Sequence, residues 1–175
     1  QQILIGPKYL PKIFKDVDKN NFPKYLHKYL SLAGKEIPYN TDQWDGYPKD
    51  REKFYKSIQS SQSNLILAGD SHNSWISNLY SKQKKFVGIE IGAPSISSPN
   101  FVDAFGDMVD PIDKSFIDTN KNLIWTNGKN KGYVELEIYS EFVEVKFIDV
   151  STVKSKRYDK LEPISFKINH NKPLI

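Results

Sequence analysis

The residues with the clearest chemical potential lie in one tetrapeptide, Gly69-Asp70-Ser71-His72. It follows Asn64–Ala68, a short apolar run that predicts a buried strand. If the backbone stays extended, residues two apart point the same way, so Asp70 and His72 would offer a carboxylate and an imidazole to one metal ion. Gly69 would let a ligand or a neighbouring backbone approach closely. The alternative is that Asp70 caps a turn and His72 is a buried histidine with satisfied hydrogen bonds.

A second segment, Asp-Gln-Trp-Asp-Gly-Tyr-Pro, places Asp42 and Asp45 beside the rings of Trp44 and Tyr47. Loop carboxylates can ligate hard cations, and neighbouring rings can shield a site or stack on a substrate. The alternative is ordinary turn chemistry, in which the rings anchor the loop to the core. Arg51, which follows closely, has the fork geometry that binds phosphate, but such an arginine on a helix more often makes a surface ion pair.

The Gly-Asp-Ser tripeptide also permits a serine esterase of the GDSL type, with Ser71 as the nucleophile. That chemistry needs a base from a later Asp-x-x-His. His170 is preceded three residues earlier by Lys167, not by an aspartate, and His72 is immediately adjacent to Ser71. The esterase hypothesis therefore lacks its catalytic partner.

The surrounding pattern predicts the elements that position these residues. Apolar residues spaced three and four apart predict helices over Asn20–Gly34 and Lys49–Ser61, and a further helix is expected to open at Ser74–Tyr80. Asn100–Thr119 indicates short helical turns. Apolar runs and alternation predict strands over the following ranges: Gln1–Gly6, Asn64–Ala68, Phe86–Ile91, Leu123–Thr126, Tyr133–Tyr139, Phe142–Val150 and Pro163–Asn169. We therefore expect a layered α/β architecture of mixed sheets with helices outside.

The amino-acid composition excludes several kinds of chemistry and of binding partner. The chain has 175 residues, which suits one compact domain, and it has no Cys, which removes disulfides and thiolate chemistry. The net charge is +4, but only Arg51 and Arg157 are arginines among 25 basic residues, so we expect no nucleic acid as a specific partner. No apolar run approaches the roughly 20 residues of a membrane span.

Four segments, taken in order, resemble the PhoD-like alkaline phosphatases, a branch of the metallophosphoesterases. The resemblance runs from about Gln1 to Tyr158 and rests on the following stretches: Trp-Asp-Gly-Tyr-Pro from Trp44 with Arg51, Leu65–Trp75 with Gly-Asp-Ser-His-Asn-Ser-Trp, Phe86–Pro99 ending in Pro-Ser-Ile-Ser-Ser-Pro, and Gly132–Thr152. It implies the C-terminal part of a layered α/β/β/α fold. Residues 1–160 would be the C-terminal portion of the phosphatase domain, and residues 161–175 a tail or edge strand.

The resemblance also implies metal-dependent hydrolysis of phosphate mono- or diesters, with a small-molecule phosphate ester as substrate and calcium with iron as the metals. On this mapping Asp70 is a metal ligand, His72 is a ligand or a catalytic partner of the transition state, and Asp45 is a weaker ligand candidate. Family members are usually exported, so a periplasmic or extracellular location is implied.

One departure from the family is large. The family's site also draws on acidic, Asn and often Cys residues well upstream of the Trp-Asp-Gly-Tyr block, and only 41 residues precede Asp42 here. We therefore expect that an upstream part of the same protein is needed to complete the site and that this chain alone has little activity. A non-catalytic, degenerate phosphatase-fold binding domain is the alternative.

Overall fold

A computed structural model describes residues 2–22, 24–59 and 63–175 and contains two stacked β-sheets. The first sheet has the strand order β1-β3-β2-β4, in which β1 runs parallel to β3 and β2 runs antiparallel to both β3 and β4. The second is antiparallel, in the order β5-β6-β7. The strands are β1 (Leu65–Ala68), β2 (Ser74–Tyr80), β3 (Phe86–Gly92), β4 (Leu123–Asn127), β5 (Lys131–Ile138), β6 (Phe142–Val150) and β7 (Ile164–Asn169).

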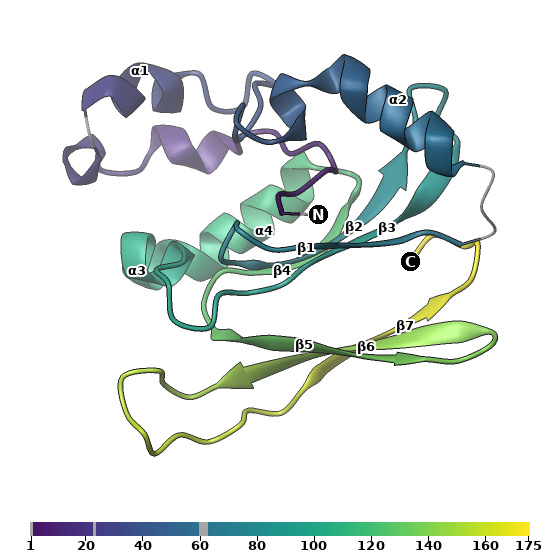
Figure 1. The fold of residues 1–175 in the computed structure, drawn as a ribbon. Coiled ribbons are helices and arrows are strands. Elements are labelled where there is room, and N and C mark those ends of the chain that lie inside the picture. The colour runs from purple at the N-terminus through teal and green to yellow at the C-terminus, as the bar shows by residue number, and fades with distance from the viewer. Residues whose placement is uncertain (1, 23, 60–62) are drawn as a thin grey trace.

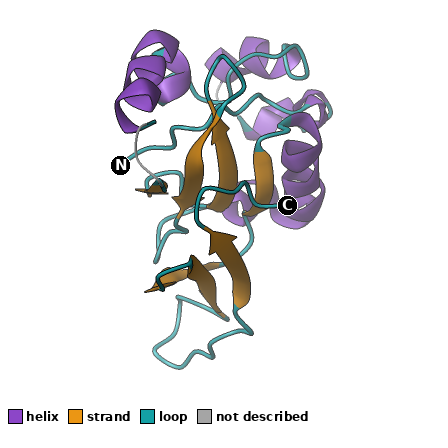
Figure 2. Ribbon diagram, turned by 90° about the vertical axis from the view of Figure 1, so that its right-hand side faces the viewer, coloured by secondary structure: helices purple, strands orange, loops and turns teal. Residues whose placement is uncertain are grey.

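The helices cover the face of the first sheet that points away from the second sheet (Figures 1 and 2). The α-helices are α1 (Lys24–Ser31), α2 (Pro48–Ile58), α3 (Phe101–Phe105) and α4 (Val109–Thr119). Short 3-10 helices are Lys12–Lys15, Lys19–Asn21, Trp44–Gly46 and Gly106–Met108. None of the described helices is long and apolar enough to cross a bilayer.

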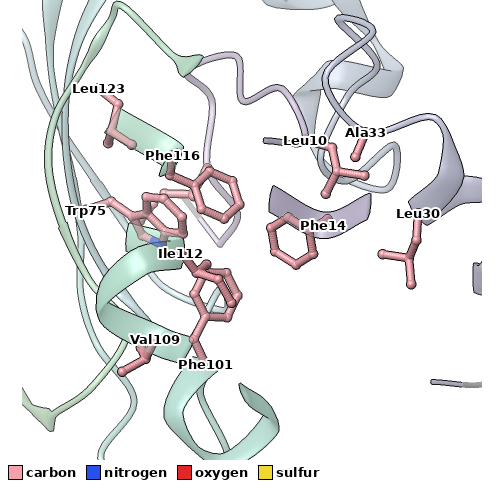
Figure 3. Packing of buried hydrophobic residues seen from close by; sticks show 12 residues of the cluster. Leu10, Phe14, Leu30, Ala33, Trp75, Phe101, Val109, Ile112, Phe116 and Leu123 are labelled. Atoms are coloured by element: carbon pink, nitrogen blue, oxygen red, sulfur yellow. The ribbon is translucent and has the colours of Figure 1, made fainter. Parts of the chain in front are cut away.

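Aromatic rings hold the helices to the first sheet. Trp75 of β2 is fully buried, and its ring lies 5.4 Å from that of Phe116 on α4 and 6.1 Å from that of Phe101 on α3, both edge to face (Figure 3). Such edge-on pairs add to the free energy that burial itself supplies. The position of α3, and of the loop before it, is therefore fixed relative to the start of β2.

A second apolar cluster lies between the two sheets. Ile76 of β2 and Ile91 of β3 pack against Val145 and Phe147 of β6, and all four side chains are buried. Trp75 and Ile76 are neighbours in sequence and point to opposite faces, as a strand requires. Strand β2 is thus buried on both faces.

Three element predictions were wrong. Residues Val109–Thr119 form one continuous α-helix, α4, instead of short helical turns. Residues Ser74–Tyr80 form strand β2, not the opening of a helix. Residues 2–6 form no strand, because the amides of Ile5 and Gly6 donate to the carboxylate of Glu90 instead of to a neighbouring strand. Gln1, where that predicted strand began, lies outside the described residues. So do residues 60–62, where the second predicted helix was to end, and α2 ends at Ile58.

The predicted mixed α/β architecture with two sheets is confirmed. The expected fourth layer, helices on the outer face of the second sheet, is absent from the ranges that the structure describes. Strand β7 is an edge strand of the second sheet, and its Ile168 joins the cluster between the sheets. The division of the chain at residue 160 stays a prediction.

Candidate active site

A tight turn joins the end of β1 to the start of β2 and carries Asp70 and His72. Both residues have left-handed backbone, with φ of 60° and 63°, and the Ser71 amide donates to the Gly69 carbonyl at 2.6 Å. Non-glycine residues rarely adopt this conformation, and each instance costs on the order of 1 kcal/mol or more. The prediction of extended backbone through this tetrapeptide was therefore wrong, and the surrounding contacts must hold the turn in place.

His72 is held by the loop that follows β3. Its ring nitrogen Nδ1 lies 2.7 Å from the Pro99 carbonyl oxygen, which can only accept, so Nδ1 carries the proton. The carbonyl of His72 in turn accepts from the Ser95 amide at 3.1 Å. In the neutral ring this leaves Nε2 as a free lone pair, with no hydrogen-bond partner among the described residues. A backbone carbonyl on one ring nitrogen and an open second nitrogen is the usual arrangement of a metal-ligating histidine.

Asp70 is exposed, and its carboxylate has no hydrogen-bond or ion-pair partner in the described parts of the chain. The adjacent Gly69 is also open: the nearest atom to a Cβ built there is the Gln2 carbonyl oxygen at 3.9 Å. Space for a ligand therefore exists beside the turn. Both side chains are of donor types that metal ions take, because carboxylates suit hard cations and imidazoles suit transition metals.

Asn73 ties the turn to the helical layer. Its Oδ1 accepts from the Phe101 amide at the start of α3 at 3.1 Å, and its Nδ2 donates to the Ser71 carbonyl at 3.2 Å. Sequence reasoning missed both Asn73 and Pro99. The only sign of Asn73 in the sequence was its position directly after His72. The Pro99 carbonyl has no side-chain signature, so only the fold reveals it.

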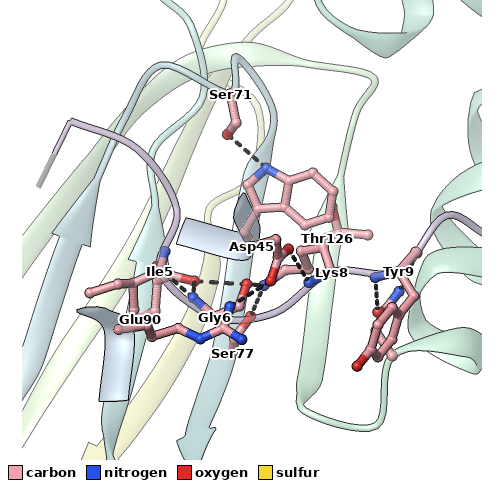
Figure 4. Close-up of polar contacts among 12 residues, drawn as sticks. Ile5, Gly6, Lys8, Tyr9, Asp45, Ser71, Ser77, Glu90 and Thr126 are labelled. Atoms are coloured by element: carbon pink, nitrogen blue, oxygen red, sulfur yellow. Dashed lines mark hydrogen bonds and ion pairs between the residues drawn. The ribbon is translucent and has the colours of Figure 1, made fainter. Parts of the chain in front are cut away.

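Ser71 lacks the surroundings of a nucleophile. Its Oγ accepts from the Trp75 indole Nε1 at 2.8 Å (Figure 4). All three histidines are described, and each contacts other groups: His72 the Pro99 carbonyl, His27 the Phe22 carbonyl, and His170 the Ser63 hydroxyl and the Tyr139 carbonyl. No imidazole is hydrogen-bonded to Ser71, so the esterase hypothesis has no base.

The carboxylate of Asp45 has a structural role in the fold. Its Oδ1 accepts from Arg51 Nη1 at 2.5 Å and its Oδ2 accepts from the Lys8 amide at 2.9 Å, and its side chain is 8% exposed. Both oxygens are thus used to join the N-terminal segment to α2. No three His, Asp or Glu side chains of the described ranges gather into a metal-binding group, so Asp45 does not join Asp70 and His72. We therefore drop Asp45 from the ligand set.

A buried ion pair anchors the same N-terminal segment to the first sheet. Lys8 and Glu90 are fully buried, and Lys8 Nζ lies 3.6 Å from Glu90 Oε2 while it donates to the Ser77 hydroxyl at 3.0 Å (Figure 4). Burial lowers the pKa of Lys8 and raises the pKa of Glu90, and the charge of each partner opposes the shift of the other. Such a pair fixes one arrangement more than it adds stability. No hydrogen bond of Lys8 or Glu90 among the described residues reaches Asp70 or His72, so we assign the pair to the scaffold.

A cavity of about 440 Å³ opens beside the turn. Ser71, His72 and Asn73 line one part of it, and Pro99 of the loop after β3 lines it too. The remaining wall is mostly aromatic. The histidine with the free Nε2 therefore borders a space large enough for a small organic ligand.

Comparisons with known proteins identify the family of this chain. The family model described as PhoD-like phosphatase matches residues 11–147. Alkaline phosphatase D of Bacillus subtilis (strain 168) is 41% identical over 66 residues, which cover 34% of this chain and 11% of that protein. A solved structure, titled "Structure of PhoD", shares the fold over 97% of this chain, with a TM-score of 0.67 and 21% identity, and 29% of that chain is covered. This sequence spans less than a third of each relative, and it belongs to the PhoD-like phosphatase family.

Proposed function

We propose that this chain supplies Asp70 and His72 to a metal-dependent site that hydrolyses phosphate mono- or diesters. The observation that carries the proposal is the His72 ring, whose Nδ1 proton is fixed by the Pro99 carbonyl so that Nε2 stays available as a ligand. The free carboxylate of Asp70 lies two residues away in the same turn. The names of the relatives, alkaline phosphatase D and PhoD-like phosphatase, support the reaction class.

Within this site each group has a separate task. A metal ion, for which we propose calcium together with iron, would stabilise the negative charge that develops on the phosphoryl oxygens. Asp70 would offer oxygen donors, and His72 would offer Nε2 either as a ligand or as a hydrogen-bond partner of the phosphoryl group. Asn73 and Pro99 would hold the turn and the ring in that orientation.

Two donors would hold a metal ion only weakly, since catalytic metal sites commonly take three protein ligands. The described residues contain no third acidic or imidazole side chain close to the pair. We therefore propose that ligands from outside this chain complete the site and that the 175-residue chain alone hydrolyses phosphate esters weakly. Export of the protein also stays a prediction of the family resemblance.

Binding of inorganic phosphate, the product of hydrolysis, tests the proposal directly. We expect 31P NMR titrations to show phosphate binding in the presence of Ca²⁺ and loss of that binding after chelation. Asp70→Asn and His72→Asn should each weaken metal-dependent phosphate binding at least 10-fold. Asp107→Asn removes an exposed carboxylate elsewhere on the surface and serves as the matched control.

Phosphate binding that is unaffected by chelation, or equal weakening by Asp70→Asn and Asp107→Asn, would contradict the assignment. A complete absence of metal-dependent phosphate binding would favour the non-catalytic binding domain instead.

A further inference from the structure

We propose that the cavity beside His72 accepts the aromatic organic group of a phosphate ester, so that aryl and nucleoside-like esters are preferred over aliphatic ones. This inference rests on the proposed function, because it places the phosphoryl group of the same substrate at Asp70 and His72. It goes further in naming the chemical class of the ester and the residues that select it.

The wall of the cavity is built from rings that reach it from distant parts of the sequence. Phe14 and Phe22 come from the N-terminal region, Tyr29 from α1, and Phe101 and Phe105 from α3. Phe14 and Phe101 point into the same interior region in Figure 3. The rings of Phe22 and Phe105 lie 5.5 Å apart and tilted by 36°, while Phe14 and Phe105 meet edge to face at 5.5 Å. An inserted aromatic ring would find both ring faces and ring edges to contact.

The electrostatics of the cavity favour a neutral ring over a charged group. Apart from His72, its lining residues in the described parts of the chain include no acidic or basic side chain. Asn40, Asn73 and Asn100 supply the polar amides. The volume of about 440 Å³ falls in the range of pockets that enclose small organic ligands. A phosphoryl group at Nε2 of His72 and a ring among the aromatic side chains would thus occupy adjoining, chemically different regions.

Tyr29 adds a polar group to the aromatic wall. Its hydroxyl is buried and has no hydrogen-bond partner among the described residues. Burial raises the pKa of Tyr29, and the charge of Asp45 adds to the rise, so the hydroxyl stays protonated and able to donate at neutral pH. A buried donor without a partner is a cost in the free protein that a ligand acceptor can remove. We expect rings with an acceptor substituent, such as nitrophenyl, to gain from this contact.

The test compares two stable phosphonates, which bind without being hydrolysed. We expect phenylphosphonate to bind the whole chain, with Ca²⁺ present, at least 10-fold more tightly than methylphosphonate in calorimetric titrations. Phe22→Ala should remove most of that preference and leave methylphosphonate binding unchanged. Tyr25→Ala is the matched control, because Tyr25 lies on α1, is 79% exposed and does not line the cavity. Tyr29→Phe should weaken 4-nitrophenylphosphonate more than phenylphosphonate.

Phenol, which has a ring but no phosphoryl group, separates the two proposals. If phenol shifts the NMR signals of the cavity residues while neither phosphonate binds in a metal-dependent way, the proposed function fails and the substrate assignment falls with it. If both phosphonates bind with equal affinity, or if Phe22→Ala and Tyr25→Ala have the same effect, the metal site stands and the aromatic subsite is overturned. If Asp70→Asn weakens the binding of both phosphonates equally and keeps the preference for phenylphosphonate, the site has separate parts for the phosphoryl group and for the ring.

Discussion

Asp45 and Asp70 have similar sequence contexts and opposite surroundings. Each precedes a small residue and lies in a stretch that resembles the family, so the sequence predicted both as metal ligands. In the structure both oxygens of Asp45 are occupied by Arg51 and the Lys8 amide, whereas Asp70 has no partner among the described residues. Lys8, the residue that settles the matter, lies 37 positions away from Asp45 in sequence. Only the fold could separate the two roles.

The structural role of Asp45 can be tested by Asp45→Asn. The substitution removes the charge that Arg51 pairs with in a nearly buried position, and we expect the free energy of unfolding to fall by about 2 kcal/mol. Asp42→Asn, at an exposed carboxylate in the same loop, should change it by less than about 0.5 kcal/mol. Urea denaturation of the three proteins measures both values. Unchanged stability in Asp45→Asn, together with weaker metal binding, would restore Asp45 to the ligand set.

Asp113 should make stability depend on pH. It lies on α4, its Oδ2 accepts from the Gly128 amide at 2.7 Å, and burial raises its pKa to about 6. An unfolded aspartate titrates near 3.9, so between about pH 4 and 6 the folded state binds more protons than the unfolded state. Stability therefore falls as pH rises through this window, since the charged form is disfavoured by burial.

Asp113→Asn should remove this part of the pH dependence and make the variant more stable relative to wild type at pH 7 than at pH 4. Thermal unfolding from pH 4 to 7 measures the difference. Asp118→Asn, at an exposed position of the same helix, should leave the pH profile unchanged. A wild-type profile that rises from pH 4 to 6 and matches that of Asp113→Asn would show that the buried carboxyl does not titrate there.

Among the strands, the sequence predicted those that alternate cleanly or form a continuous apolar run, and it missed β2, which does neither. Strands β5 and β6 alternate apolar and charged residues, because one face contacts the core and the other faces water. Strand β2 contains Ser74, Ser77 and Asn78, which are all buried, so its alternation is hidden. Distant residues pair with two of these polar groups: Ser77 accepts from Lys8, and Asn78 donates to the Leu174 carbonyl. The Ser74 hydroxyl has no hydrogen-bond partner among the described residues. Such partners cannot be read from a local window.

The β1–β2 turn depends on Asn73 as a positioning residue. Asn73→Ala would leave the Phe101 amide without its acceptor and release the turn from α3. We expect metal binding to weaken about 10-fold and the free energy of unfolding to fall by about 1–2 kcal/mol. Asn73→Asp keeps the acceptor and should recover most of the metal affinity, which a purely structural loss would not explain. Ser97→Ala, at an exposed position of the loop after β3, is the control.

At the scale of the whole molecule, β2 connects the two cores. Ile76 is fully buried between the sheets, so Ile76→Ala should lower the free energy of unfolding by about 2–4 kcal/mol. Ile138→Ala, at a residue that is 75% exposed on β5, should cost less than about 1 kcal/mol. Chemical denaturation compares the two. If Ile76→Ala and Ile138→Ala lowered the free energy of unfolding equally, the two sheets would not share the packed interface seen in the structure.

The whole molecule also explains why the site was only partly predictable. Asp70 and His72 were found from residue type and spacing, but their left-handed backbone, the Pro99 carbonyl and the Asn73 link follow from the meeting of β1, β3 and α3. The chain covers 29% of the solved PhoD chain. The proposed function depends above all on metal binding by this turn within this chain.

Paramagnetic broadening by Mn²⁺ reports which residues lie next to the bound metal ion. A 15N-labelled chain would be titrated with substoichiometric Mn²⁺, which accepts both carboxylate and imidazole ligands. We expect the amide signals of residues 69–73 to broaden first, the effect to disappear in the double variant Asp70→Asn/His72→Asn, and the effect to persist in Asp107→Asn. Broadening centred on other carboxylates, or unchanged in the double variant, would show that the metal ion binds elsewhere.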